Sequence, residues 1–512
     1  MAVPDYVPTP VDDIPTIRAE LGAAFRAGTT KPIANRREQL LALAYLLKDN
    51  IDRFKEALAS DLGRPALETD VLEVGGTLHE IKDAYDSVAR WARPQRAPFA
   101  LNYAAMRPTI RKEPKGVVLI IVPFNYPLLL TLEPLAGAIA AGCAAVVKPS
   151  ELTPAFSALL ADLVPQYLDP ALYRVVNGAV PETTKLLEQP WDHILFTGSA
   201  RVARIVLAAA ARTLSPVTTE LGGKSPVIVD ASCDLRTTAR RLVWGKTANA
   251  GQTCVAPDYV LVPRAFQDKL VQACIDVLKE FYPDGAAESD SYSRIVSPGH
   301  HARLSALLEK SGGTTAYGGG KRAEDKFIEP TIVTGVGLDD SLMSEELFGP
   351  VLPIIAVEDI NEAIQIVNAR DHPLALYVFT QDSRVKKQVL DGTQSGGAVV
   401  NDCLLQVTAD GLPFGGIGPS GSGSHTGKYS FDMFTHTRST LDNPSWLDLV
   451  MGGRFPPFTD KSTRMMRALL VPSLPARKSK SAANRWGSYW VMLSLACAAA
   501  AYGAKLIAER KQ

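Results

Sequence analysis

The stretch that decides the fold is Gly116-Val117-Val118-Leu119-Ile120-Ile121-Val122-Pro123-Phe124-Asn125-Tyr126-Pro127. Its apolar, mostly β-branched residues predict a strand buried on both faces, and the two prolines mark the turn that follows. Similar short runs alternate with helical stretches further along the chain. The runs are Ala144–Lys148, Arg174–Asn177, His193–Phe196 and Val227–Val229, and the helical stretches are Leu132–Ala141, Ala155–Val164 and Val202–Leu214. This alternation predicts βαβ units and the doubly wound parallel sheet of a Rossmann-like nucleotide-binding domain.

The residues around this sheet predict further elements. Helices are expected over Ile14–Leu62 and Leu67–Trp91, whereas Phe99–Lys112 is expected to be extended or edge-strand material. A second α/β block is predicted from Leu235 to about Pro413. The glycine-rich run Gly415–Gly423 lacks the strand before it and the helix after it that a phosphate loop needs, so it is interpreted as a structural turn.

Length and composition narrow the class of protein. A chain of 512 residues is too long for one ordinary core, so two or three domains are expected. The 54 basic residues balance the 54 acidic ones, which argues against a nucleic-acid-binding protein. The six cysteines are scattered without CxxC pairs, so we expect free thiols in a reducing compartment and no metal site. The N-terminal residues do not have the pattern of a secretory signal.

The C-terminal end is locally asymmetric in charge. From Arg454 to Arg485 there are eight Lys or Arg residues and one acid, and Trp486 to Ala504 carries no charge. About 20 apolar residues span a bilayer, and the tryptophans at one end resemble an interfacial belt. The tail therefore predicts a membrane anchor with the main body facing the cytosol; an alanine-rich soluble or interfacial helix is the alternative.

Two separate runs carry the most informative side chains. Cys254 lies among small residues in Gly251-Gln252-Thr253-Cys254-Val255-Ala256-Pro257, and Glu220 lies 34 residues upstream in Thr219-Glu220-Leu221-Gly222-Gly223-Lys224. A thiol can attack a carbonyl carbon, and a separate carboxylate can activate water to release the acyl group from sulfur. The pair therefore predicts covalent acyl chemistry on Cys254.

Polar residues that follow the predicted strands are candidates for ligand binding, because ligands of doubly wound folds lie beyond the carboxyl ends of the strands. Asn125 could donate to an oxyanion, or it could only satisfy its own turn between two prolines. Lys148 and Glu151 could bind ribose hydroxyls, and Glu151 would favour NAD over NADP; an ordinary helix start capped by Ser150 is the alternative. Gly198 and Ser199 precede a helix whose amides could approach a pyrophosphate.

Together these runs resemble the aldehyde dehydrogenase superfamily, most closely its class 3 branch with the membrane-anchored fatty aldehyde dehydrogenases. The resemblance extends from about Ile14 to Leu441. The stretches that carry it, in family order, are Pro123–Pro127, Val147–Glu151, Phe196–Ser199, Glu220–Lys224, Gly251–Pro257, Glu345–Val351 and Pro413–Gly416.

The resemblance implies a role for each matching residue. Cys254 is the expected nucleophile, Asn125 together with the Cys254 backbone N–H the oxyanion holder, and Glu220 the base. Glu346 and Phe348 are expected to position the nicotinamide end of NAD. Lys148 and Glu151 are expected at the adenosine ribose, with Gly198 and Ser199 at the pyrophosphate.

The resemblance also implies a domain plan and a homodimer. An NAD-binding domain is expected over residues 1–220, with 95–115 contributing to an oligomerisation sheet. A catalytic domain over 221–415, an oligomerisation segment over 416–445, a basic linker over 446–485 and a membrane helix over 486–508 follow. The endoplasmic reticulum is the expected membrane, with the peroxisome and the outer mitochondrial membrane left open.

The activity that this resemblance implies is NAD-dependent oxidation of medium- or long-chain aliphatic aldehydes to carboxylic acids. Two alternatives stay open at the level of the sequence. One is a dehydrogenase for semialdehydes or aromatic aldehydes, and the other is a non-catalytic membrane-bound scaffold of the same fold.

Overall fold

The computed structural model describes residues 4–472, 474 and 475. The chain divides into two compact units. The first is made of the residues up to Gln95 together with Thr109–Thr440, and the second of Arg96–Pro108 together with the chain from Leu441 onward. The first unit contains both sheets on which the sequence analysis rests.

The first sheet of this unit is doubly wound and mostly parallel. Its order is β17-β7-β6-β3-β4-β5, and only β17 runs antiparallel to its neighbour. The strands are β3 (Val117–Ile121), β4 (Ala144–Lys148), β5 (Tyr173–Val175), β6 (His193–Gly198), β7 (Val217–Leu221) and β17 (Gly421–Ser422). The strand order reverses between β3 and β6, which is where ligands bind in folds of this kind.

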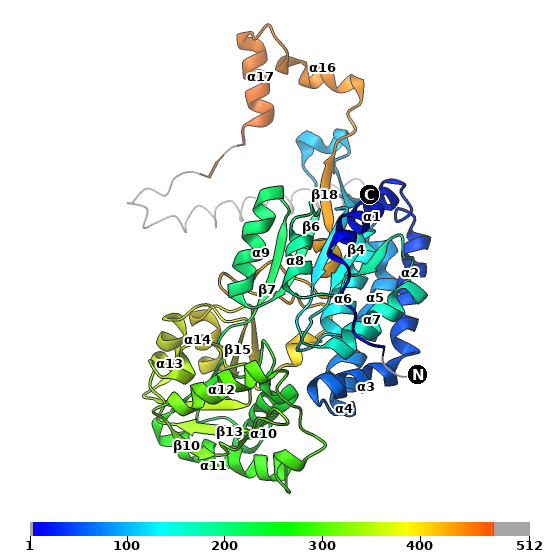
Figure 1. Cartoon of the computed structure of the whole chain (residues 1–512). Coiled ribbons are helices and arrows are strands. Elements are labelled where there is room, and N and C mark those ends of the chain that lie inside the picture. Colours follow the sequence, from blue (N-terminus) through cyan, green and yellow to red (C-terminus); the bar gives the residue numbers. More distant parts are fainter. Residues whose placement is uncertain (1–3, 473, 476–512) are drawn as a thin grey trace, which may run out of the picture. The chain divides into compact units, whose positions relative to one another are not determined.

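Helices cover both faces of this sheet (Figure 1). Right-handed crossovers place α6 and α7 on one face, with α2, α3 and α5 packed against them, and α1, α8 and α9 on the other. Their bounds are α1 (Ile14–Arg26), α2 (Ile33–Lys48), α3 (Ile51–Leu62), α5 (Gly75–Trp91), α6 (Leu129–Ala141), α7 (Pro154–Tyr167), α8 (Val180–Leu187) and α9 (Ala200–Thr213). All residues of β3 and α6 are buried, as expected for elements enclosed on every side.

A short α4 (Ala66–Thr69) and a π-helical turn, η2 (Asp70–Val74), lead directly into α5. The predicted helical stretch Leu67–Trp91 is therefore continuous but not uniformly α-helical. Single π-helical turns often lie near functional sites. Here the turn carries Glu73, whose carboxylate reaches the loop after β3.

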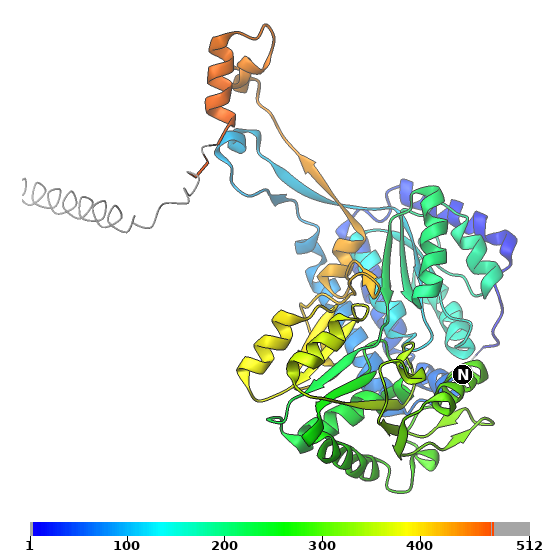
Figure 2. The same ribbon diagram turned by 90° about the vertical axis from the view of Figure 1, so that its left-hand side faces the viewer.

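The second sheet has the order β10-β13-β14-β9-β8-β15-β16, and only β10 is antiparallel to its neighbour. Its strands are β8 (Pro226–Val229), β9 (Tyr259–Pro263), β10 (Thr314–Tyr317), β13 (Thr331–Thr334), β14 (Val351–Val357), β15 (Ala375–Phe379) and β16 (Gly397–Val400). The associated helices are α10 (Leu235–Thr247), α11 (Arg264–Phe281), α12 (Pro298–Lys310), α13 (Ile360–Asn368) and α14 (Ser383–Gly392). Figure 2 shows this second α/β layer in green and yellow. The second α/β block predicted from the sequence is thus present.

The small β element is a sheet of order β1-β2-β18. In it β2 (Thr109–Pro114) pairs antiparallel with β18 (Thr435–Thr440), while β1 spans Gln95–Arg96. The expectation of extended chain over Phe99–Lys112 is wrong for Leu101–Met106, which forms the 3-10 helix η3. Ala104 and Ala105 favour helical turns, and the strand starts only after Pro108.

The described part of the second unit contains the short helices α16 (Asp448–Met451) and α17 (Asp460–Leu470). Met106, Leu447 and Met451 form its small buried core, and Asn102 Nδ2 donates to the Leu469 carbonyl at 2.7 Å. Among the residues that the structure describes, no helix is both long and apolar enough to cross a membrane. The predicted membrane helix at 486–508 lies outside those residues.

Candidate active site

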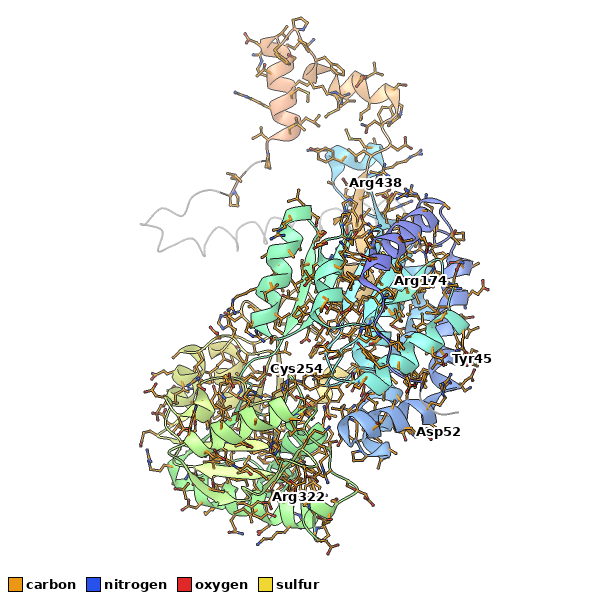
Figure 3. All side chains as sticks on the ribbon, viewed as in Figure 1. Tyr45, Asp52, Arg174, Cys254, Arg322 and Arg438 are labelled. Carbon is orange, nitrogen blue, oxygen red and sulfur yellow. The ribbon has the colours of Figure 1, made fainter. Side chains whose placement is uncertain are left out.

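Cys254 follows an unusual backbone turn. Helix α10 ends at Thr247, and then Asn249, Ala250 and Gly251 adopt φ values of 51°, 51° and 74° in succession. The left-handed region costs an L-residue with a side chain free energy, so two consecutive non-glycine residues there must be held by their surroundings. The turn leaves Cys254 half-buried and packed against the core of the second sheet (Figure 3).

Hydrogen bonds to three other segments hold this turn in place. The Asn249 backbone N–H donates to Glu68 Oε1 at 2.8 Å, and Asn249 Nδ2 donates to the Asn125 carbonyl at 2.9 Å. Gln252 Nε2 donates to the carbonyls of Asn249 and Arg294, both at 3.0 Å. The segment that carries Cys254 is therefore fixed to the loop that follows β3.

The loop after β3 is itself held by a buried ion pair. The Arg64 guanidinium contacts Glu73 and also donates to the Asn125 carbonyl. Glu73 Oε2 accepts the N–H groups of Leu128 and Leu129, at 2.8 and 2.9 Å. Breaking a buried pair of this kind costs about 3–5 kcal/mol, so the position of Asn125 is well determined.

Asn125, the expected oxyanion holder, is buried. The next residue, Tyr126, makes a 2.7 Å hydrogen bond through its hydroxyl to Thr253 Oγ1, directly beside Cys254. The structure thus joins the Asn125 loop and the Cys254 loop, which are far apart in the sequence. The buried Arg64, Glu73 and Asn249 in this assembly carry no motif, and sequence reasoning did not identify them.

Glu220 lies on β7 and is 1% exposed. Neither of its carboxylate oxygens has a hydrogen-bond partner within the described residues. Burial, and then the charge of Glu346, raises the pKa of Glu220 to about 8. A buried carboxylate without partners is costly, so its retention suggests a chemical role.

Glu346 forms the second acidic group at the site. Burial, and then the charge of Asp258, raises its pKa to about 8. Its carboxylate lies against Gly222, where any side chain would collide with it. Phe348 has a left-handed φ of 51°, and its ring stands edge-on to that of Phe124 at 5.7 Å.

The thiol of Cys254 completes the acidic group. Burial raises its pKa well above the ordinary value, and the charges of Glu220 and Glu346 raise it further. A negative charge on Glu220 or on Glu346 therefore opposes ionisation of the Cys254 thiol. A cation placed among them would relieve this repulsion, and the oxidised nicotinamide ring is such a cation. The residues present fit that cofactor.

The residues expected to bind the rest of the cofactor lie at other strand ends of the same sheet. Lys148, at the end of β4, is buried, and its Nζ donates to Glu151 Oε2 at 3.0 Å. Glu151 is exposed. Ser199, at the end of β6, caps α9 by accepting the Val202 N–H at 3.4 Å. A side chain at position 198 would collide with the ring of Phe196, so only glycine fits there without a shift. The N-terminus of α9 is therefore not covered by a side chain from this position.

The first unit contains two cavities, one lined mainly by apolar residues and one lined largely by ionisable residues. A cavity of about 350 Å³ is bordered by Thr247 and Ala248, just before the nucleophile turn. Its other walls are mainly apolar and include Leu67, Val71, Leu72, Trp244 and Phe281. A cavity of about 890 Å³ lies between α5, α6 and the segment around Gly427, and ionisable residues line much of it.

The larger cavity contains a carboxyl pair, Glu80 and Glu133. Burial raises the pKa of Glu80 to about 7, and it raises that of Glu133 well above its ordinary value. Glu80 Oε1 accepts the Gly427 N–H at 2.8 Å. The pair was not found from the sequence, because its members lie on two different helices without a shared motif.

Comparison with known proteins gives a consistent result. Residues 10–440 match the profile described as the aldehyde dehydrogenase family. Aldehyde dehydrogenase family 3 member A2 of Mus musculus is 43% identical over 451 residues, which cover 88% of this chain and 93% of that protein. The Canis lupus familiaris protein named "Aldehyde dehydrogenase, dimeric NADP-preferring" is 44% identical over 442 residues, 86% of this chain and 97% of its own.

A solved structure gives the same result for the fold. It is named "Substrate bound state of Staphylococcus Aureus AldH" and superposes with a TM-score of 0.86 at 40% identity. The match covers 89% of this chain and 99% of that chain. The α/β architecture described above is therefore shared along nearly the full length of that protein.

The buried carboxyl groups predict how stability depends on pH. Unfolded Glu220 and Glu346 titrate near 4.5 and folded ones near 8, so the folded chain holds more protons between these values. The free energy of unfolding should therefore fall as pH rises from about 4.5 to about 8. A difference of one in pKa corresponds to about 1.4 kcal/mol. Glu220→Gln lacks one of these carboxyl groups, so from pH 5 to pH 8 its free energy of unfolding should rise by at least about 1 kcal/mol relative to that of the parent.

Urea unfolding of both proteins at pH 5, 6.5 and 8 measures this gain. Lys185→Met, which removes a surface ion pair with Glu188, is the control and should keep the parent's pH dependence. Equal pH dependence in the parent and in Glu220→Gln would show that the carboxyl is not held protonated by the fold.

Proposed function

The chain belongs to the aldehyde dehydrogenase family, and on that premise we propose that it oxidises aliphatic aldehydes of medium or long chain to carboxylic acids, with NAD as the cofactor and Cys254 as the nucleophile. The observation that carries the assignment of roles is the half-buried Cys254 thiol. The charges of the buried Glu220 and the half-buried Glu346 act on this thiol, and each of these residues has a carboxylate oxygen without a hydrogen-bond partner in the described part of the chain.

In the first half of the proposed reaction, the Cys254 thiolate attacks the aldehyde carbon and a carbon–sulfur bond forms. Asn125 Nδ2 and the Cys254 backbone N–H donate to the oxygen as it gains negative charge. A nicotinamide ring held by Glu346 and Phe348 would supply the acceptor for the hydride that leaves the same carbon. The oxidised carbon stays on Cys254 as a thioester.

In the second half, Glu220 acts as a base on water. The water oxygen attacks the thioester carbon, its proton passes to a Glu220 oxygen, and the carbon–sulfur bond breaks to release the carboxylic acid. Both Glu220 oxygens are free of protein hydrogen bonds within the described residues, so either can receive that proton. A base with a pKa of about 8 is well matched to proton transfer near neutral pH.

The cofactor assignment rests on the strand-end residues. Glu151 is exposed beside Lys148 at the end of β4, and its carboxylate would repel the 2′-phosphate of NADP. Gly198 and Ser199 open the N-terminus of α9 to a pyrophosphate. Glu346 and Phe348 would hold the nicotinamide end. One relative is named NADP-preferring, so both cofactors belong in the assay.

The proposed substrate class rests on the smaller cavity. Its mainly apolar walls adjoin the turn that presents Cys254, and Leu67 and Val71 remain exposed at its side. Each buried methylene of an alkyl chain contributes about 0.8 kcal/mol, which an apolar wall of this kind could provide.

We also propose that the protein is a homodimer. The name of one relative contains the word dimeric, which supports this proposal.

The catalytic assignment predicts two different defects. Cys254→Ala should lose at least about 10³-fold in the rate of NADH formation from hexanal, because no thioester can form. Glu220→Gln should still form NADH in a first turnover and then slow by about 10²–10⁴-fold, because the thioester accumulates. Stopped-flow absorbance at 340 nm separates the two.

The same assay, run with NAD and with NADP, checks the cofactor. A higher kcat/KM with NADP would contradict the role given to Glu151. Loss of the first turnover in Glu220→Gln would place that residue before hydride transfer and contradict its role as the base for hydrolysis.

The substrate class is tested by comparing acetaldehyde, hexanal and hexadecanal. We expect kcat/KM to rise from the shortest to the longer chains, and Leu72→Asp to reduce this gain by at least about tenfold, because a charge would enter the apolar wall. Val7→Asp, which changes an exposed residue of the N-terminal segment, is the control. A parent enzyme that prefers acetaldehyde would contradict the long-chain assignment.

We also propose that the tail anchors the enzyme to a membrane, with the endoplasmic reticulum as the expected location. The support is the sequence alone: a basic segment followed by Trp486–Ala504 without charge. A fluorescent fusion carrying only residues 446–512 should colocalise with an endoplasmic reticulum marker. Replacing Leu493 and Leu495 by Arg should release it, and a diffuse signal from the unaltered fusion would contradict the anchor.

A further inference from the structure

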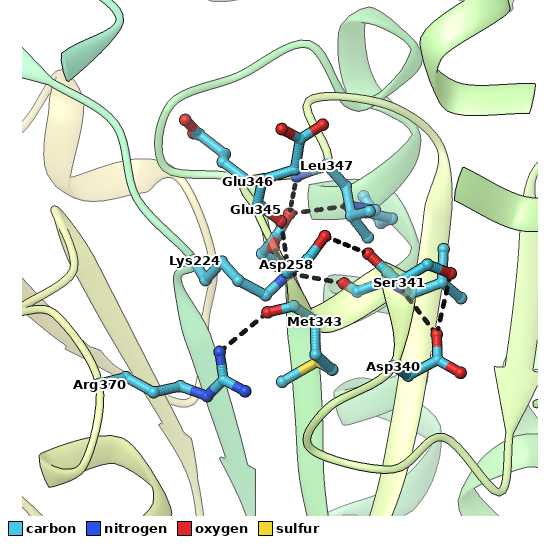
Figure 4. A network of polar contacts seen from close by, with 12 residues as sticks. Lys224, Asp258, Asp340, Ser341, Met343, Glu345, Glu346, Leu347 and Arg370 are labelled. Carbon is cyan, nitrogen blue, oxygen red and sulfur yellow. Dashed lines mark hydrogen bonds and ion pairs between the residues drawn. The ribbon is translucent and has the colours of Figure 1, made fainter. Parts of the chain in front are cut away.

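A buried ion pair lies under the loop that carries Glu346. Lys224 Nζ contacts Asp258 Oδ2 and also donates to the carbonyls of Leu342 and Glu345, at 2.8 and 2.9 Å (Figure 4). The side chains of Lys224 and Asp258 are only 10% and 4% exposed. Solvent screens such a pair little, so its geometry is tightly coupled to that of the loop.

Asp258 binds the same loop from the other oxygen. Its Oδ1 accepts the Leu347 N–H at 3.0 Å. The ion pair therefore holds the backbone on both sides of Glu346, through Glu345 before it and Leu347 after it. Charge-assisted hydrogen bonds of this type are about twice as strong as neutral ones.

Both ends of the pair continue into reacting segments. Lys224 stands four residues after Glu220, and Asp258 stands four residues after Cys254. The Asp258 backbone N–H also donates to the Ser225 carbonyl at 2.8 Å, which joins these two segments directly. One ion pair thus connects the base, the nucleophile and the Glu346 loop.

A second lysine, Lys246, lies beside Asp258 without adding a hydrogen bond. Lys246 Nζ lies 3.8 Å from Asp258 Oδ1 and has no hydrogen-bond partner within the described residues. The carboxylate of Asp258 therefore faces two cationic side chains.

These contacts fix the position of Glu346 and leave one of its carboxylate oxygens without a hydrogen-bond partner among the described residues. Its carboxylate lies against Gly222, and its Oε1 has no hydrogen-bond partner in the part of the chain that the structure describes. Hydrogen bonds to the backbone on each side of Glu346 position the side chain, and its carboxylate also accepts a backbone hydrogen bond from Gly223. An oxygen left free in this way is available to a ligand hydroxyl.

We propose that Lys224 and Asp258 are positioning residues that set Glu346 for the nicotinamide ribose, and Phe348 for the ring, in register with Cys254. This inference rests on the proposed function, because it takes Glu346 to be the cofactor contact. Neither Lys224 nor Asp258 needs to touch the cofactor or the aldehyde. A displacement of about 1 Å at such a contact can cost about 10²-fold in rate.

The test compares a reaction that needs the cofactor with one that does not. Lys224→Met removes the cation, whereas Asp258→Asn keeps an oxygen for the Leu347 N–H and removes the charge. Both should raise the KM for NAD by at least about tenfold and make hydride transfer rate-limiting, with Asp258→Asn the milder. A primary isotope effect on kcat with aldehyde deuterated at the carbonyl carbon should then appear or increase.

Hydrolysis of p-nitrophenyl acetate through Cys254 provides the cofactor-free readout. It uses the same thioester and the same water attack, so both variants should retain it within about threefold of the parent. Lys321→Met, which removes an exposed ion pair with Glu309, is the matched control and should leave both reactions unchanged. A parallel loss of ester hydrolysis would show that the pair supports the Cys254 loop in general, and would overturn the proposal.

Glu346→Gln separates this inference from the function on which it rests. If Glu346→Gln leaves the KM for NAD and the isotope effect at parental values, the cofactor role of Glu346 fails and the positioning role fails with it. If Glu346→Gln is impaired while Lys224→Met and Asp258→Asn match the parent, the positioning role alone is wrong. If Lys224→Met does not fold, as judged by circular dichroism, Asp258→Asn decides.

Discussion

The candidate active site depends on one electrostatic constraint. Burial raises the pKa of Glu220, Cys254 and Glu346; the charge of Glu346 adds to that of Glu220, and the charges of Glu220 and then Glu346 add to that of Cys254. Burial alone disfavours each charge, and their proximity adds repulsion. Among the residues that the structure describes, both glutamates have a carboxylate oxygen without a hydrogen-bond partner. The arrangement is destabilising for the protein by itself and favourable for a cationic ligand, which is the balance expected of a binding site that also reacts.

Two buried ion pairs stabilise the loops that carry these acidic groups and Asn125. The Arg64–Glu73 ion pair holds the Asn125 loop, and the Lys224–Asp258 ion pair holds the Glu346 loop. Between them, Asn249–Gly251 is kept in a strained turn by hydrogen bonds from three segments. Within the described residues, both oxygens of Glu220 and one of Glu346 lack hydrogen-bond partners, whereas Arg64, Glu73, Lys224 and Asp258 each make at least one ion pair or hydrogen bond. The ion pairs therefore hold the loops rigid, and the side chains on those loops are the ones proposed to react.

The sequence predicted the parts of this assembly that are local. β3 and β4 follow from dense β-branched runs, and Cys254, Glu220 and Asn125 follow from motifs at strand and helix ends. Arg64, Glu73 and Asp258 could not be found in this way, because each acts through a partner distant in sequence. The 3-10 helix at Leu101–Met106 was missed for a related reason: a weak local preference outweighed the expected sheet pairing.

The two glutamates also explain why the Cys254 thiol should be less reactive before the site is filled than after it. As long as Glu220 and Glu346 can ionise, their charge keeps the Cys254 pKa high. A cation between the three groups lowers the pKa of all of them at once, because each charge then has a counter-charge. The thiolate and the ionised base would thus be produced together by cofactor binding. The raised pKa of Cys254 therefore predicts a nucleophile that reacts faster when a hydride acceptor is bound and more slowly, but still measurably, without one.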